Sequence, residues 1–104
     1  MDLILQLLRK IHKQPLIYLG KKSIERLDVF LTGYIYRQCE IDEGFDANCM
    51  RGFQEYVEAL YNTNLCIKWS EIIKLNCPDD EKAFEIFFTL FEKYLESESG
   101  FDSI

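Results

Sequence analysis

The sequence predicts an all-α fold: a single domain over residues 1–104 that forms a bundle of about five helices. Apolar residues recur at spacings of three and four in five stretches, as they do on one face of a helix. Glycine, proline and asparagine separate these stretches. A hydrophobic content of 48%, with 14% aromatic residues, is sufficient for a folded core in a chain of this length. The expected helices span residues 2–13, 24–40, 47–61, 65–76 and 80–96.

The first expected helix ends before Pro15, because proline cannot continue a helix. The apolar residues 16–19 that follow are expected to form a connector that is too short for a helix. Gly20 can adopt a positive φ, and Ser23 is a suitable N-cap for the second helix. These features predict a tight turn between the first two long helices.

Two expected helices contain a glycine near their middle, Gly33 and Gly52. Such a glycine costs about 1 kcal/mol relative to alanine, and it often marks the close approach of another part of the chain. We expect the connector, through Tyr18, to lie against Gly33. Gly52 is expected to allow close packing of the third helix.

Residues 40–48 interrupt the apolar pattern and are expected to form a loop. The spacing of their oxygen-bearing side chains does not fit a Ca²⁺-binding loop. Asp46 or Asn48 is a candidate cap for the third helix. The loop is either a solvated turn or a contact for a basic partner, and its carboxylates are Glu40, Asp42, Glu43 and Asp46.

The last two helices are marked by aromatic residues and by a clear helix start. Residues 65–76 have helical spacing, although a strand stays possible at their beginning, and Trp69 is expected in the core. Pro78 ends this stretch. The acidic residues that follow favour the positive end of the next helix, and they are Asp79, Asp80 and Glu81. The helix over 80–96 is the most aromatic and is expected at the centre, with residues 97–104 as a frayed tail.

No catalytic, metal or cofactor site can be assembled from the sequence, so we do not expect an enzyme. The single histidine, His12, is expected at the surface. The four cysteines include no C-x-x-C pair, which argues against zinc, and no glycine-rich phosphate loop is present. Without a signal peptide or an apolar run of about 20 residues, the protein is expected in the cytoplasm, with free and mostly buried thiols.

The net charge of −6 is unevenly distributed. Residues 1–52 carry 8 Lys and Arg against 7 Asp and Glu, whereas residues 53–104 carry 4 against 11. Such a surface repels nucleic acid and attracts basic proteins, although a surplus of glutamate also simply favours solubility. A monomer is the simplest expectation for the oligomeric state.

Residues 15–34 follow the pattern P-x-x-Y-L-G-x-x-S-x-x-x-L-x-x-F-L-x-G-Y. This pattern resembles the beginning of small helical bacterial immunity proteins of the contact-dependent growth inhibition and polymorphic toxin type. The similarity extends to about residue 95, although the family often has tryptophan near the position of Tyr56. The motif residues are expected to be structural, and they are Pro15, Tyr18, Gly20, Ser23, Gly33, Tyr34 and Trp69.

The resemblance implies a protein that binds and neutralises a cognate toxin domain, without a catalytic residue or a membrane partner. A basic nuclease is the toxin class that an acidic surface suits best. An acidic adaptor that binds a basic cellular protein is the alternative. The candidate partner-binding residues are Glu40, Asp42, Glu43, Asp46, Glu55, Glu58, Asp79, Asp80, Glu81 and Glu85.

Overall fold

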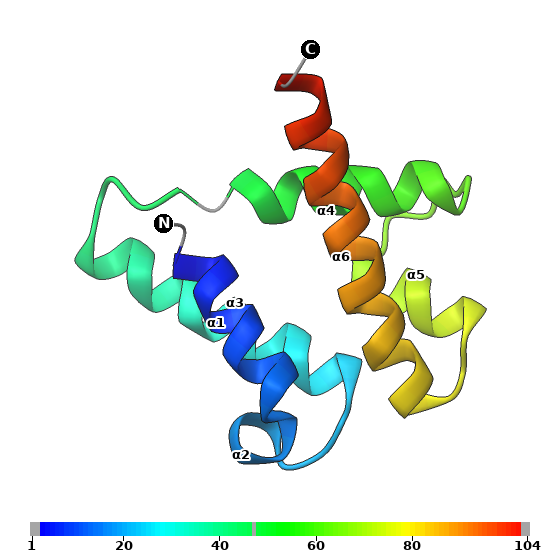
Figure 1. The fold of residues 1–104 in the computed structure, drawn as a ribbon, viewed down its shortest axis with the longest axis horizontal. Helices are drawn as coiled ribbons and strands as arrows, with labels where there is room; N and C mark the ends of the chain where they lie inside the picture. Colours follow the sequence, from blue (N-terminus) through cyan, green and yellow to red (C-terminus); the bar gives the residue numbers. More distant parts are fainter. Residues whose placement is uncertain (1–2, 47, 103–104) are drawn as a thin grey trace.

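Six helices joined by turns and short loops make up the computed structural model, which describes residues 3–46 and 48–102 (Figure 1). The described residues contain no strand, and the predicted all-α class is confirmed. The helices are α1 (Leu3–Lys13), α2 (Pro15–Leu19), α3 (Ile24–Ile41), α4 (Asn48–Leu60), α5 (Trp69–Asn76) and α6 (Asp80–Asp102).

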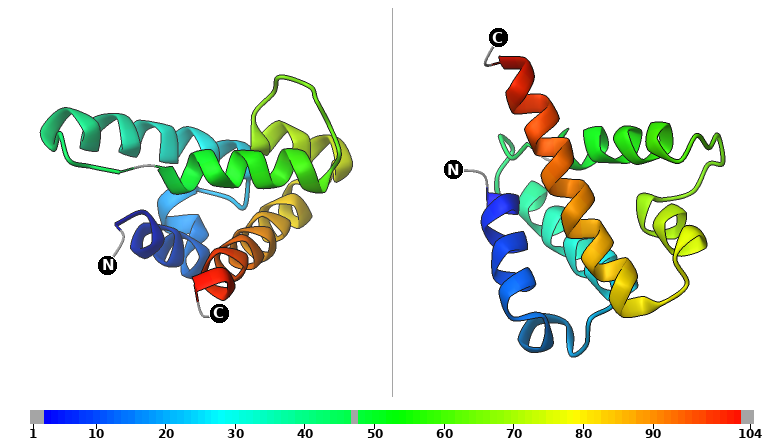
Figure 2. Two further views of the ribbon diagram at one scale, coloured as in Figure 1. Left: turned by 90° about the horizontal axis from the view of Figure 1, so that it is seen from above. Right: turned by 45° about the vertical axis from the view of Figure 1, so that its right-hand side comes forward.

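The long helix α6 packs against α3, α4 and α5, as expected for the most aromatic element. Its buried side chains meet α4 and α5 in an aromatic cluster (Phe53, Trp69, Phe87, Phe91 and Tyr94). The ring centroid of Phe53 lies within 6 Å of the ring centroids of Trp69, Phe87, Phe91 and Tyr94. In Figures 1 and 2, α4 lies across α6, and in the view of Figure 1 the first three helices lie to the left of α6 and α5 to its right.

The turn between α1 and α3 contains one helix more than the sequence predicts. The connector is a short helix, because Pro15 occupies the first turn of α2, where a missing N–H costs nothing. Gly20 ends α2 with a φ of +82°, and its N–H bonds the carbonyl of Leu16. Ser23 caps α3 as expected, accepting a hydrogen bond of 3.2 Å from the N–H of Arg26.

Two other helix boundaries differ from the prediction by more than one residue. Residues 65–68 are not helical, and α5 begins only at Trp69. Glu96 does not end α6, which continues to Asp102. The expected starts at residues 2 and 47, and the last two residues of the predicted tail, lie outside the described residues.

The prediction for Gly33 is wrong, whereas that for Gly52 is confirmed. A Cβ atom added to Gly33 would meet nothing within 4 Å. Tyr18 instead packs on Phe30, with ring centroids 6.3 Å apart. A Cβ atom added to Gly52 would collide with the hydroxyl of Tyr94, so α4 and α6 approach closely at this glycine.

Cys39, Cys66 and Cys77 are free thiols, but the prediction that most of the cysteines are buried is wrong. Cys39 and Cys66 are exposed, and Cys49 and Cys77 are half-buried. Cys39 and Cys66 therefore lie at the surface, whereas Cys49 and Cys77 pack against the edge of the core. Among the described helices, none combines the length and the apolar character needed to cross a membrane.

Candidate functional site

The predicted acidic residues do not form one patch: the loop after α3 and the start of α6 lie near opposite ends of α3, and Glu55 and Glu58 lie on α4. The loop after α3 carries Asp42, Glu43 and Asp46. The start of α6 lies near the other end of α3, where Lys74 is 3.6 Å from Glu25 and also pairs with Asp80. An 18-residue helix is about 27 Å long, so these two acidic regions are well separated.

In the loop, two of the carboxylates accept hydrogen bonds from backbone N–H groups and so stabilise the local conformation of the chain. Asp42 accepts a hydrogen bond of 2.9 Å from the N–H of Gly44, and Asp46 accepts one of 2.8 Å from the N–H of Asn48. The second bond confirms that Asp46 helps to start α4. Glu40 pairs with Arg37 at 3.2 Å. Within the described chain, Glu43 has no such partner and is exposed.

The carboxylates at the start of α6 are similarly occupied. Asp79 accepts a hydrogen bond of 2.9 Å from the N–H of Lys82, as an N-cap does. The hydrogen bond from Lys74 lowers the pKa of Asp80, and the same bond raises the pKa of Lys74. Glu81 is exposed and forms no hydrogen bond or ion pair with the described residues.

Glu85 links α6 to the beginning of the chain. Its carboxylate lies 3.0 Å from Nε2 of His12 and 3.8 Å from Nζ of Lys22. The ring of His12 stacks on Phe88 with centroids 4.0 Å apart, and the histidine is exposed as expected. On α4, Glu58 accepts a hydrogen bond from Gln54, whereas Glu55 is exposed.

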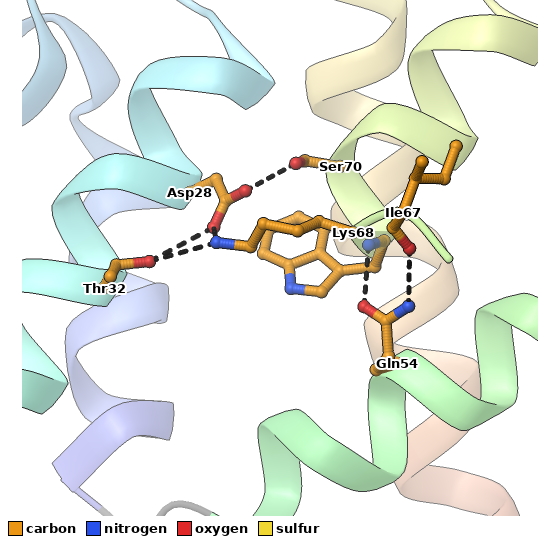
Figure 3. A network of polar contacts seen from close by, with 7 residues as sticks. Asp28, Thr32, Gln54, Ile67, Lys68 and Ser70 are labelled. Carbon is orange, nitrogen blue, oxygen red and sulfur yellow. Dashed lines mark hydrogen bonds and ion pairs between the residues drawn. The ribbon is translucent and has the colours of Figure 1, made fainter. Parts of the chain in front are cut away.

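A polar network between α3, α4 and α5 is the feature that the sequence did not reveal (Figure 3). Its centre is Asp28, which is 8% exposed on the inner side of α3. One carboxylate oxygen of Asp28 is 2.7 Å from Nζ of Lys68, and the other accepts a hydrogen bond of 2.5 Å from Ser70. Thr32 also contacts the Lys68 amine, at 3.3 Å.

Gln54 forms the second half of the network. Its amide oxygen accepts a hydrogen bond of 2.7 Å from the N–H of Trp69, and its amide nitrogen donates one of 2.9 Å to the carbonyl of Ile67. Because the first N–H groups of a helix have no partner within it, Gln54 satisfies one of them for α5. These bonds fix where α5 begins, which explains the shortened helix.

A hollow of about 190 Å³ adjoins the network. The Asp28 carboxylate there is already engaged by Lys68 and Ser70 through both oxygens, so it is not a free base or ligand. Over the described residues, no group of three or more His, Cys, Asp or Glu is arranged to hold a metal ion. The network therefore serves to join three helices. In the sequence, the only sign of this network was Asp28, an acidic residue among the inward-facing positions of α3.

Apolar side chains are exposed on α2 and α3. The largest exposed fractions are 73% for Ile17 of α2, and 74% for Val29 and 68% for Tyr36 of α3. Ile41, at the end of α3, is 61% exposed and precedes the acidic loop. Apolar and acidic groups therefore occur together at this end of α3, as they do in many protein interfaces.

The comparisons with known proteins add no relative. No protein-family model, curated sequence or solved structure matches this chain.

Proposed function

We propose that the protein is a cytoplasmic immunity protein that binds a cognate toxin domain and neutralises it. The proposal is supported by the resemblance of residues 15–34 to such proteins and by the net charge of −6. The observation that carries it is the exposure of carboxylates that have no partner in the described chain. Glu43 and Glu81 are the main examples, and Glu55 of α4 is also exposed.

A basic nuclease is the toxin class with the complementary surface. A nuclease needs positive charge to hold its nucleic acid, and an acidic protein can cover that charge. Electrostatic attraction accelerates association, and apolar contacts that exclude water slow dissociation. Tyr36 and Ile41, exposed near the acidic loop, are the apolar residues best placed for such contacts.

The ten acidic candidates do not contribute equally to this proposal. Asp42, Asp46 and Asp79 hold local backbone conformations, so their replacement would disturb the turn as well as the charge. Glu43 and Glu81 form no hydrogen bond or ion pair with the described residues. They are therefore the residues whose replacement reports on partner binding alone.

The test uses, as the candidate toxin, a protein domain encoded beside the gene for this chain. Wild-type protein is expected to rescue cells from that toxin and to bind it faster at low salt than at high salt. Glu43→Lys and Glu81→Lys should each lower the association rate at low salt, and the difference should shrink at high salt. Glu92→Lys, at an exposed position of α6, controls for net charge.

The absence of both binding and rescue would overturn the proposal. Equal association rates for the three lysine variants and the wild type would exclude these two carboxylates as the contact. If the protein instead captured a basic cellular protein and gave no rescue, the adaptor function would replace the immunity function.

A further inference from the structure

The outer side of α3 is not covered by any other described helix, and Figure 2 (left) shows this helix along one edge of the molecule. Residues spaced by three and four place Arg26, Val29, Gly33, Tyr36 and Glu40 on this side. We call these five residues the α3 outer face. Each is exposed, with fractions of 74% for Val29 and 68% for Tyr36.

Gly33 lies at the middle of the α3 outer face and creates a flat place on the helix. An added Cβ would have no neighbour within 4 Å, so nothing in the described chain requires a glycine here. Glycine lowers the helix propensity of α3. A second helix can, however, approach a glycine more closely than the usual axis separation of about 8–10 Å.

An open groove runs beside the N-terminal half of the same face. It lies between α2 and α3 and has a volume of about 370 Å³. Its walls include the rings of Tyr18 and Phe30 and the side chain of Val29. The groove is therefore suited to an aromatic side chain, and such a side chain, Tyr36, projects from the other half of the α3 outer face.

The α3 outer face is complementary to itself. If two copies of α3 cross antiparallel at Gly33, residues equally distant from the glycine face each other. Tyr36 of one copy then lies opposite Phe30 of the other, each about 4.5 Å along the helix from the crossing point. Seven residues from Gly33, Arg26 of one copy lies opposite Glu40 of the other.

Arg26 and Glu40 can each form a further hydrogen bond or ion pair. Arg26 uses Nη1 to donate a hydrogen bond of 2.7 Å to the Leu19 carbonyl, and a guanidinium has five N–H donors. Glu40 pairs with Arg37, but its side chain is 47% exposed. Two symmetric Arg26–Glu40 pairs would counter the repulsion between two chains of net charge −6.

We propose that the protein forms a symmetric homodimer through the α3 outer face. In this dimer the two helices cross at Gly33, and Tyr36 of each copy enters the α2–α3 groove of the other. The partner is thus a second copy of this chain. The inference needs no toxin, but Tyr36 and Glu40 belong both to this dimer surface and to the proposed toxin contact, so the two surfaces overlap at these residues.

The experiment is analytical ultracentrifugation of the purified full chain over a wide concentration range. The wild-type mass is expected to rise from 12.4 kDa towards twice that value. Glu40→Arg and Arg26→Glu should each be monomeric, because each places like charges opposite each other twice. An equimolar mixture of the two variants should form a heterodimer, because one pair then keeps its native Arg26–Glu40 sign and the other is restored with its sign reversed.

Tyr36→Glu provides a second test, because Arg26 also holds the Leu19 carbonyl and its variant can fail to fold. Tyr36 is exposed, so Tyr36→Glu should keep its circular dichroism spectrum and raise the dimer Kd at least about tenfold. Leu75→Glu on α5, where the side chain is 67% exposed, is the matched control and should leave the Kd unchanged.

A wild-type mass that stays at 12.4 kDa at millimolar concentration would overturn the proposal. A dimer that Tyr36→Glu does not weaken would also overturn it, since the copies would then meet elsewhere. A mixture of folded Glu40→Arg and Arg26→Glu chains that remains monomeric would exclude the antiparallel crossing at Gly33.

Discussion

The side of α4 that faces α6 and the outer side of α3 both carry a mid-helix glycine, but their surroundings are opposite. At Gly52, the Tyr94 hydroxyl occupies the space that a Cβ atom would need. At Gly33, that space is empty to a distance of 4 Å. A glycine in a helix therefore indicates only that a side chain is missing. Whether a neighbour fills the gap depends on which side of the helix faces the core.

The two sides also differ in what stabilises them. The side around Gly52 belongs to the aromatic cluster, in which Phe53 and Phe87 have no exposed surface. Burial of such rings contributes stability in proportion to the apolar area removed from water, and their edge-to-face contacts add to it. The outer side of α3 contributes little to the fold of one chain, so substitutions there report on other contacts.

The largest expected effect is that of Phe53→Ala. Phe53 is fully buried and packs against five other aromatic rings, so its truncation should lower the free energy of unfolding by about 3–5 kcal/mol. Tyr36→Ala, on the outer side, should change it by less than about 0.5 kcal/mol. Urea denaturation measures both, at concentrations where the mass is 12.4 kDa.

Equal losses for Phe53→Ala and Tyr36→Ala would contradict the distinction between the two sides. The comparison is matched because each substitution removes one aromatic ring from a helix. The slope of the urea transition should stay the same in both variants, since the surface exposed on unfolding hardly changes.

The next largest loss of stability is expected in the polar network around Asp28. Asp28→Ala should cost about 1–3 kcal/mol, because Ser70 loses its hydrogen-bond acceptor and Lys68 loses its ion-pair partner. Lys68→Met should cost less, because the Lys68 side chain is 55% exposed and its amine interacts partly with water. Thermal unfolding of both variants separates the two contributions.

A cost for Lys68→Met that equals or exceeds that of Asp28→Ala would mean that the ion pair, rather than the buried Ser70 bond, dominates the network.

Glu43→Gln, which removes an exposed carboxylate from the loop, should leave the stability within about 0.5 kcal/mol of the wild type.

How much of the fold could be predicted depends on whether the cause is local. The Ser23 cap, the positive φ of Gly20 and the helix start at Asp79 and Asp80 follow from neighbouring residues, and the sequence predicted them. The start of α5 depends on Gln54, which is distant in sequence, so the spacing of apolar residues placed it too early. Helical spacing alone cannot show that a side chain from another helix occupies the first N–H groups.

The candidate site was predictable to a smaller extent. The sequence identified the acidic residues, Asp46 and Asp79 among them as residues at helix starts, but it could not show that Asp42 also binds a backbone N–H group and that Glu43 and Glu81 do not. It also placed Tyr18 against Gly33, whereas Tyr18 lies on Phe30. Both errors concern the direction of a side chain around its helix, which depends on how the helices are rotated against each other.

Gly52→Ala tests the filled side directly and should destabilise the protein by about 1–2 kcal/mol. The new methyl group collides with the Tyr94 hydroxyl, and this strain exceeds the gain in helix propensity. Tyr94→Phe removes the hydroxyl, so the double variant should be more stable than the sum of the two single changes predicts. Strict additivity in urea denaturation would show that Tyr94 moves aside without cost.

Gly33→Ala should have a smaller effect than Gly52→Ala, and its sign should be opposite. The methyl group has free space and alanine is the better helix former, so the free energy of unfolding of the monomer should rise by about 0.5–1 kcal/mol. A loss of stability would show that α3 needs the glycine within one chain. In the proposed dimer the same methyl group lies at the crossing point and should raise the dimer Kd. A variant that is more stable as a monomer but weaker as a dimer would locate the reason for this glycine outside the single chain, whereas the reason for Gly52 lies within it.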